Sequence, residues 1–278
     1  MSNMYLVKQK TAKCIKYIFL IGFALTSLYP FIWVLITSLK DNNDIYGNGF
    51  GLPKVYKWNN YIEAWKNAQV GISFFNSLTI CLLALAALIL ITCMGSYAMM
   101  RVRKSKIITA YFSLGIMIPI HILLIPIVIL FGKLHLTDNH LSLVIAYIAI
   151  NISISLFILN GFFAAIPTEI DEAAIIDGCG RCGIFFKIML PLVKPGIATV
   201  ATLAFLNCWN DLVVGLVLIS TPVKRTLSMS ISVMKGAYVT QYGILCAGFV
   251  ISIVPVVIMY LLFQKQIISG MTAGAVKG

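Results

Sequence analysis

One acidic side chain stands within the long apolar stretches of this sequence, and two amides accompany it. Asn207, Asn210 and Asp211 are spaced by three and four residues, which predicts that they share one face of a helix. An ionisable group inside a membrane is costly and is therefore a functional candidate by default. This face could hydrogen-bond the hydroxyl groups of a solute, or it could bond to a neighbouring helix. The two uses are compatible where a solute path is lined by interface residues.

A second candidate for chemistry is the C-x-x-C pair Cys179 and Cys182. Zinc would need two further ligands nearby, and a redox motif would need a βαβ context, and the surrounding sequence offers neither. The chain also has no clustered catalytic residues and no G-x-x-x-x-G-K-[ST] phosphate loop. We therefore expect no enzymatic activity and no bound cofactor or metal in this chain.

The segment that holds this pair, residues 166–196, reads IPTEIDEAAIIDGCGRCGIFFKIMLPLVKPG. Thr168 and Asp171 fit a capping box, and Gly178 fits a left-handed stop. A second helix is expected at about 183–189, ended by Pro191, which lacks a backbone donor. The small pair Ala173–Ala174 would let another surface approach closely. The segment opens with four acids, which an anionic leaflet would repel, so a docking surface for a cytoplasmic protein is favoured over a lipid-resting helix.

Composition indicates which elements position these residues. Mean hydropathy is +0.96 and only 11% of residues are charged, against about 25% in soluble proteins. The expected fold is an all-α integral membrane protein, because the apolar runs do not alternate as barrel strands do. Six transmembrane helices are predicted at 15–38, 74–97, 107–131, 141–164, 197–219 and 243–263.

The net charge of +12 is dispersed between these spans, which favours membrane orientation over nucleic-acid binding. The basic cluster at 101–106 lies on a short loop and is therefore expected inside. Both termini of this multi-pass protein are then cytoplasmic. The predicted organisation is an N-terminus at 1–14, a turn-rich and irregular extracellular loop at 39–73, a core domain at 74–263 and a tail at 264–278.

One spacing is typical of a known family. The pattern E-A-A, three residues, G, nine residues, I-x-L-P stands here as Glu172-Ala173-Ala174, Gly178 and Ile188-Met189-Leu190-Pro191. It resembles the signature loop of binding-protein-dependent ABC importer permeases. Further resemblance, at MIPIHILLIP, LNGFFAAIP, WND and the tail GMTAGAVKG, is to the carbohydrate-uptake branch and its maltose permease G subunits. It covers most of the chain from about residue 70.

The resemblance implies a type I ABC importer permease fold in the cytoplasmic membrane. It implies a second homologous permease, two ATPase subunits that bind ATP and magnesium, and an extracellular solute-binding protein. The solute would be sugar-like, with glycerol phosphate or a peptide as alternatives; a secondary transporter would usually need more spans and more buried charges. The implied ATPase-coupling residues are Glu172, Ala173, Ala174, Asp177, Gly178, Ile188, Leu190 and Pro191.

Overall fold

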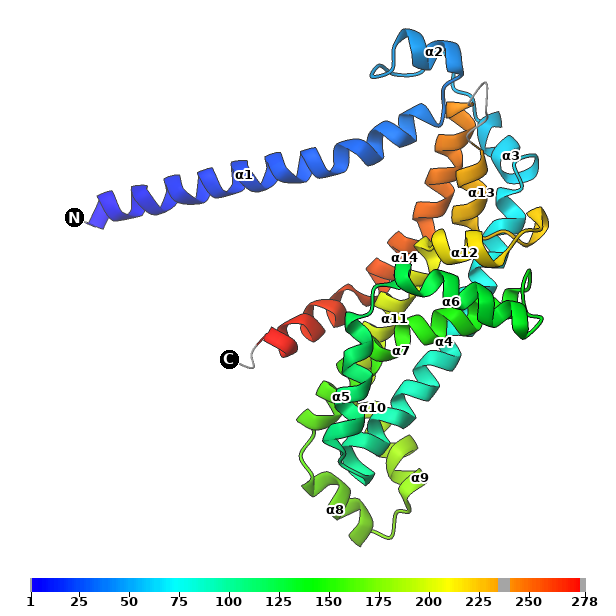
Figure 1. Cartoon of the computed structure of the whole chain (residues 1–278). Coiled ribbons are helices and arrows are strands. Elements are labelled where there is room, and N and C mark those ends of the chain that lie inside the picture. The colour runs from blue at the N-terminus through cyan, green and yellow to red at the C-terminus, as the bar shows by residue number, and fades with distance from the viewer. Residues whose placement is uncertain (1, 235–240, 276–278) are drawn as a thin grey trace. The chain divides into compact units, whose positions relative to one another are not determined.

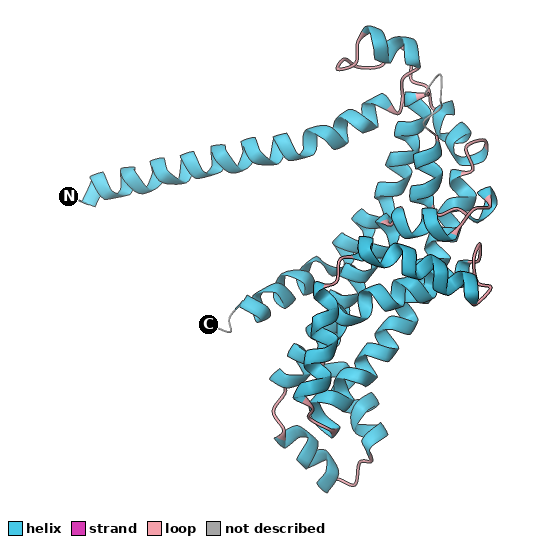
Figure 2. Ribbon diagram, viewed as in Figure 1, coloured by secondary structure: helices cyan, strands magenta, loops and turns pink. Residues whose placement is uncertain are grey.

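A computed structural model describes residues 2–234 and 241–275, and every regular element within those ranges is a helix (Figure 2). The side chains of 2–12 and 265–275 lie outside the described part. The chain divides into two compact units, Met1–Ala68 with Val233–Ile251, and Gln69–Ser232 with Ser252–Gly278. Each unit is described by itself.

The first unit begins with α1 (Ser2–Thr37), which runs unbroken through the expected N-terminal segment and the first span. Its side chains from residue 13 to residue 32 are all exposed, as suits a helix that faces lipid or another subunit. The unit also contains α2 (Asn42–Gly47), α3 (Asn59–Lys66) and the beginning of α14 (Tyr242–Ala275).

The segment after α1 has more order than its composition indicated. The Asp41 side chain caps α2 by accepting the backbone N–H of Asp44 at 2.9 Å. The ammonium of Lys40, a fully buried side chain, donates to the carbonyl of Asn48 at 2.8 Å. The expectation of an irregular loop at 39–73 is thus wrong for the two short helices, because local caps and buried hydrogen bonds fix the backbone there.

Three helices form the centre of the second unit: α4 (Val70–Tyr97), α7 (His140–Ala165) and α11 (Lys194–Asn210) (Figure 1). A one-turn π-helix, η1 (Ala98–Val102), extends α4. The other elements outside the segment 166–196 are α5 (Lys106–Leu114), η2 (Gly115–Met117), α6 (Ile120–Lys133), α12 (Val213–Leu218), η4 (Pro222–Lys224), α13 (Leu227–Val233) and the remainder of α14.

Four helices in the described part are long and apolar enough to cross a membrane, or up to six spans if each of two bent helix pairs is one span. The predicted span 107–131 is one bent pair, in which the helices on either side of Pro119 differ in direction by 100°. Pro119 has extended backbone (ψ 131°) and so does Ile118 before it (ψ 113°), as expected for a residue that precedes proline.

The predicted continuous span 197–219 is wrong. Helix α11 ends at Asn210, Asp211 is extended (ψ 131°), and α12 begins at Val213. The second bent pair instead joins α11 to the helical residues 181–192, at 72°. The apolar composition of 197–219 indicated burial in a membrane but carried no signal for this break.

Candidate functional site

The segment 166–196 folds as helix, glycine turn and helix at one end of the second unit (Figure 1). Helix α8 (Glu169–Ile176) ends before Gly178, whose φ of +77° confirms the predicted left-handed stop. The second helical run is longer than expected and comprises α9 (Arg181–Gly183), the π-helix η3 (Ile184–Met189) and α10 (Leu190–Leu192). The prediction that Pro191 ends this run is wrong: the run continues to Leu192.

The predicted capping box is also wrong, because Thr168 makes no side-chain cap to α8. Asp171 instead pairs with Arg101, whose Nη1 lies 3.0 Å from Asp171 Oδ2. The side chains of this pair are only 5% and 19% exposed. The other terminal nitrogen of Arg101 donates to the carbonyls of Phe163 and Ile166, at the end of α7. One guanidinium thus ties the end of α7 to the first turn of α8. From the sequence alone, Arg101 is only one positive charge of the basic cluster at 101–106.

The two alanines of the E-A-A pattern have different surroundings. Ala174 is buried and packs with Phe163, Phe185 and Met189 in the core of this unit, whereas Ala173 is exposed. The expectation that both are open to another surface is therefore wrong for Ala174. Beside Ala173, the outer face of α8 exposes Glu172, Ile175 at 62% and Ile176 at 84%.

The remaining positions of the signature pattern lie in the second helical run and at the end of α8. Ile188 and Leu190 are half-buried and pack against the same core cluster, while Pro191 is exposed. Asp177 is exposed and forms the C-terminal cap of α8. The segment is thus packed on its inner side and presents acidic and apolar side chains on its outer side.

The two amides of the predicted polar face lie on the last turn of α11, and both are exposed. Asn207 donates from its amide nitrogen to Asn151 Oδ1 at 2.9 Å. Asn151 is buried in α7 and donates to the carbonyl of Tyr147 at 2.8 Å. A buried amide in the neighbouring helix therefore orients Asn207, and Asn210 lies one turn further along.

Asp211 does not continue that helical face, contrary to expectation. Its carboxylate accepts the Tyr147 hydroxyl at 2.9 Å and the backbone N–H groups of Val214 and Gly215 at 3.2 and 3.0 Å. These are donors in the first turn of α12, which have no partner within that helix. The carboxylate therefore holds the break between α11 and α12, and its hydrogen bonds explain how an acid is accommodated within this apolar stretch of the chain.

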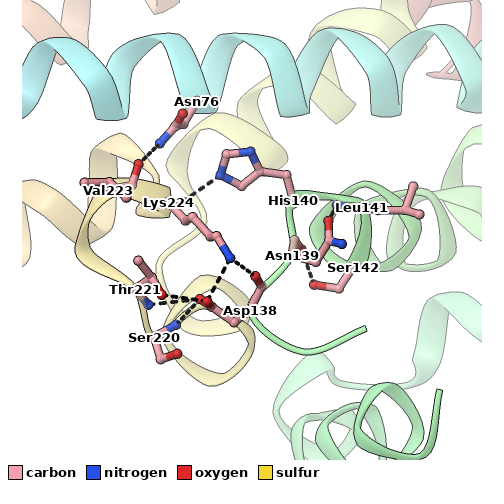
Figure 3. A network of polar contacts seen from close by, with 10 residues as sticks. All are labelled: Asn76, Asp138, Asn139, His140, Leu141, Ser142, Ser220, Thr221, Val223 and Lys224. Atoms are coloured by element: carbon pink, nitrogen blue, oxygen red, sulfur yellow. Dashed lines mark hydrogen bonds and ion pairs between the residues drawn. The ribbon is translucent and has the colours of Figure 1, made fainter. Parts of the chain in front are cut away.

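A polar network fixes the loop that follows α12 (Figure 3). Asp138, between α6 and α7, accepts the backbone N–H groups of Ser220 and Thr221 at 3.0 and 2.9 Å. It also accepts the Thr221 hydroxyl at 2.6 Å and pairs with Lys224 at 2.9 Å. The hydrogen bond from the Thr221 hydroxyl, with the backbone and Lys224 bonds, holds the pKa of Asp138 well below its usual range.

Two further elements hold the same loop. Asn76 of α4 donates to the carbonyl of Val223 at 2.9 Å, and His140 Nε2 lies 2.9 Å from the Lys224 carbonyl (Figure 3). Asn76 also donates to the carbonyl of Arg225 at 3.0 Å. This loop contacts His140, the first residue of α7, whereas the segment 166–196 follows Ala165, the last residue of α7. A helix of 26 residues is about 39 Å long, so α7 connects two fixed surfaces at its opposite ends.

The long apolar helices define the class of this protein as a multi-pass membrane protein. Residues 85–271 match the family described as "Binding-protein-dependent transport system inner membrane component". The chain belongs to this family, and its relatives are ABC transporter permease subunits rather than enzymes. The expected family is therefore confirmed.

Three relatives show how far the similarity extends. The chain is 34% identical over 261 residues to the probable starch degradation products permease AmyC of Thermoanaerobacterium thermosulfurigenes, covering 92% of this chain and 95% of that one. It is 32% identical to the sulfoquinovosyl glycerol permease SmoH of Agrobacterium fabrum, covering 90% and 89%. It is also 32% identical to the trehalose/maltose permease MalG of Thermococcus litoralis, covering 92% and 93%.

A solved structure supports the fold. A crystal structure of a bacterial ABC transporter involved in the import of the acidic polysaccharide alginate contains a chain that aligns with a TM-score of 0.80. The alignment covers 92% of this chain and 96% of that chain at 22% identity. The expected type I permease fold is thereby confirmed.

Proposed function

We propose that this chain translocates a sugar across the cytoplasmic membrane as one permease subunit of an ABC importer, and that α8 couples it to a separate ATPase subunit. The observation that carries the coupling proposal is the two-sided character of α8. Its inner side is fixed by the Arg101–Asp171 pair and by buried Ala174. On its outer side, Glu172 of the E-A-A pattern and Ile176 are exposed. The adjacent Ile175 and Ile176 form an exposed apolar patch beside polar residues, and such rimmed apolar patches mark interaction sites.

The same contacts supply a path for motion. A neighbour that moves α8 also moves Asp171, and Asp171 is paired with the guanidinium that holds the end of α7. Packed interfaces switch between discrete arrangements, so a displacement of α8 would be passed to α7 without deforming it. ATP and magnesium bind in the partner subunits, a second homologous permease completes the path, and an extracellular solute-binding protein delivers the solute.

The proposal of a sugar is supported by the sugar substrates for which the relatives are named and by the exposed amides Asn207 and Asn210. Neutral amides donate and accept hydrogen bonds, as hydroxyl groups require. An anionic solute such as glycerol phosphate would meet the carboxylate of Asp211 close by. Glycerol phosphate and peptides remain the alternatives against which uptake is compared.

The proposed orientation, with 166–196 and both termini inside, is tested by thiol labelling. Cys182 is exposed in the described structure. A membrane-impermeant maleimide is expected to label it in inverted vesicles and not in intact cells, with Cys182→Ser as the background control. Rapid labelling of Cys182 from outside would reverse the topology.

The coupling proposal is tested by charge reversal on the outer face of α8. Glu172→Lys is expected to reduce solute uptake at least tenfold in reconstituted complexes, because it replaces an acid where the partner would dock; a loss of 1.4 kcal/mol corresponds to a factor of about 10. Glu169→Lys is the matched control, since Glu169 is an exposed acid of the same first turn outside the E-A-A pattern.

Subunit co-purification, ATPase activity and uptake are measured together for both variants. Equal uptake and an equal ATP requirement in Glu172→Lys and wild type would show that α8 is not the coupling element. A similar loss in both variants would indicate a general effect of positive charge rather than a defined docking position.

A further inference from the structure

A cavity of about 530 Å³ lies beside the segment 166–196, and Arg101 and Ile166, whose contact is described above, form part of its wall. Its lining comes from η1, from residues 104 and 105 before α5, from α5 itself, and from the end of α7 with the residues that follow it. Three cationic side chains, those of Arg101, Lys104 and Lys106, line it together with apolar Met100, Ala110 and Ile166. The cavity is therefore amphipathic.

The charge of this lining is unbalanced. None of the residues that line the cavity is acidic, and Asp171, outside it, neutralises only Arg101. Lys104 and Lys106 are exposed, and neither forms an ion pair within the described part of the chain. Arg101 Nε, in a side chain only 5% exposed, is buried there without a hydrogen-bond partner. Two lysines without an ion-pair partner in the described part of the chain thus line a space of suitable size for a headgroup.

We propose that this cavity binds an anionic phospholipid, with the headgroup phosphate between Lys104 and Lys106 and the upper acyl chain against Met100 and Ala110. Basic pockets between membrane helices at the cytoplasmic surface bind anionic headgroups. The inference rests on the proposed orientation, which places residues 101–106 at the inner leaflet. The apolar wall favours a lipid over free phosphate, which would leave that wall in contact with water.

Lipid retention tests this site without requiring transport. The full chain, purified with its assembled subunits, is placed in nanodiscs of equal phosphatidylglycerol and phosphatidylcholine, extracted into mild detergent and examined by native mass spectrometry. Wild type is expected to retain phosphatidylglycerol preferentially. The double variant Lys104→Gln/Lys106→Gln should lower that preference by about fivefold for each lysine removed. Lys133→Gln is the control, since Lys133 is an exposed lysine at the end of α6.

A second variant separates the lipid from other anions. Ala110→Trp fills the apolar wall without changing charge and is expected to lower phosphatidylglycerol retention, and added inorganic phosphate should not displace the lipid. Equal retention of the two lipids, or equal losses in the Lys104/Lys106 and Lys133 variants, would overturn the proposal. Displacement by phosphate with no effect of Ala110→Trp would assign the site to free phosphate instead. Because uptake is not measured, failure here leaves the coupling proposal intact.

Discussion

Replacing Arg101 with alanine is expected to abolish coupled uptake while the membrane helices still insert. The substitution leaves Asp171 without its cation and the carbonyls of Phe163 and Ile166 without their donor. Removing one partner of a buried pair costs about 3–5 kcal/mol, and the lower end applies here because Asp171 is 19% exposed. That cost falls on the junction between α7 and α8, which the coupling proposal requires to be rigid.

Three variants make this test specific. Arg103→Ala removes an exposed arginine two residues away and should leave uptake near the wild-type level. Asp171→Asn breaks the charge pair while keeping Arg101 beside the cavity, so it separates loss of coupling from loss of lipid. Arg101→Lys keeps the charge but cannot reach both Asp171 and the α7 carbonyls with the same fork geometry.

Uptake, ATPase activity and thermal unfolding of the reconstituted complex are measured for each. We expect Arg101→Ala and Asp171→Asn to hydrolyse ATP with little uptake. Normal uptake in both variants would show that the ion pair does not transmit motion from α8.

The second large effect is expected at Asp211. Asp211→Ala should lower both uptake and thermal stability, because the carboxylate is an N-terminal cap for α12 as well as the acceptor for Tyr147. Loss of a cap costs about 0.5–2 kcal/mol, and an orphaned buried hydroxyl adds about 1–3 kcal/mol. Asn210→Ala, one residue earlier and exposed, should lower uptake alone.

Comparing the Asp211 and Asn210 variants separates a loss of uptake caused by a destabilised fold from one caused by a lost solute contact. Tyr147→Phe removes one hydrogen bond to Asp211 and keeps the α12 cap, so its melting temperature should fall between those of Asp211→Ala and wild type. If Asn210→Ala and Asn207→Ala both transport normally, the amides do not line the solute path. An unchanged melting temperature in Asp211→Ala would contradict the capping role.

Features set by neighbouring residues could be predicted from the sequence, and features set by distant ones could not. The long apolar runs, the left-handed Gly178 and the E-A-A spacing all depend on short stretches of chain. The capping box of Thr168 and Asp171 was a reasonable local prediction, but Arg101, 70 residues away, competes for that carboxylate. Tertiary contacts override local preference whenever a buried charge has a partner elsewhere.

The same distinction explains the errors in the polar face. A spacing of three and four residues assumes an unbroken helix, and nothing near Asn207 marks the break. The backbone donors of Val214 and Gly215 engage Asp211 only because the chain turns there. Likewise, the pattern could not show that Ala174 packs inward while Ala173 faces outward, since that difference depends on where Phe185 and Met189 pack.

The first compact unit has a consequence for the order of events during synthesis. Asn42, the first residue of α2, accepts the backbone N–H of Tyr242 at 3.0 Å, across a separation of 200 residues. Ribosomes add about 5–20 residues per second, so this contact cannot form until about 10–40 seconds after Asn42 has been made. During that interval the central helices α4, α7 and α11 of the second unit can already pack together, because they precede Tyr242 in the chain. The contact between α2 and the start of α14 therefore forms only after these three helices have been made.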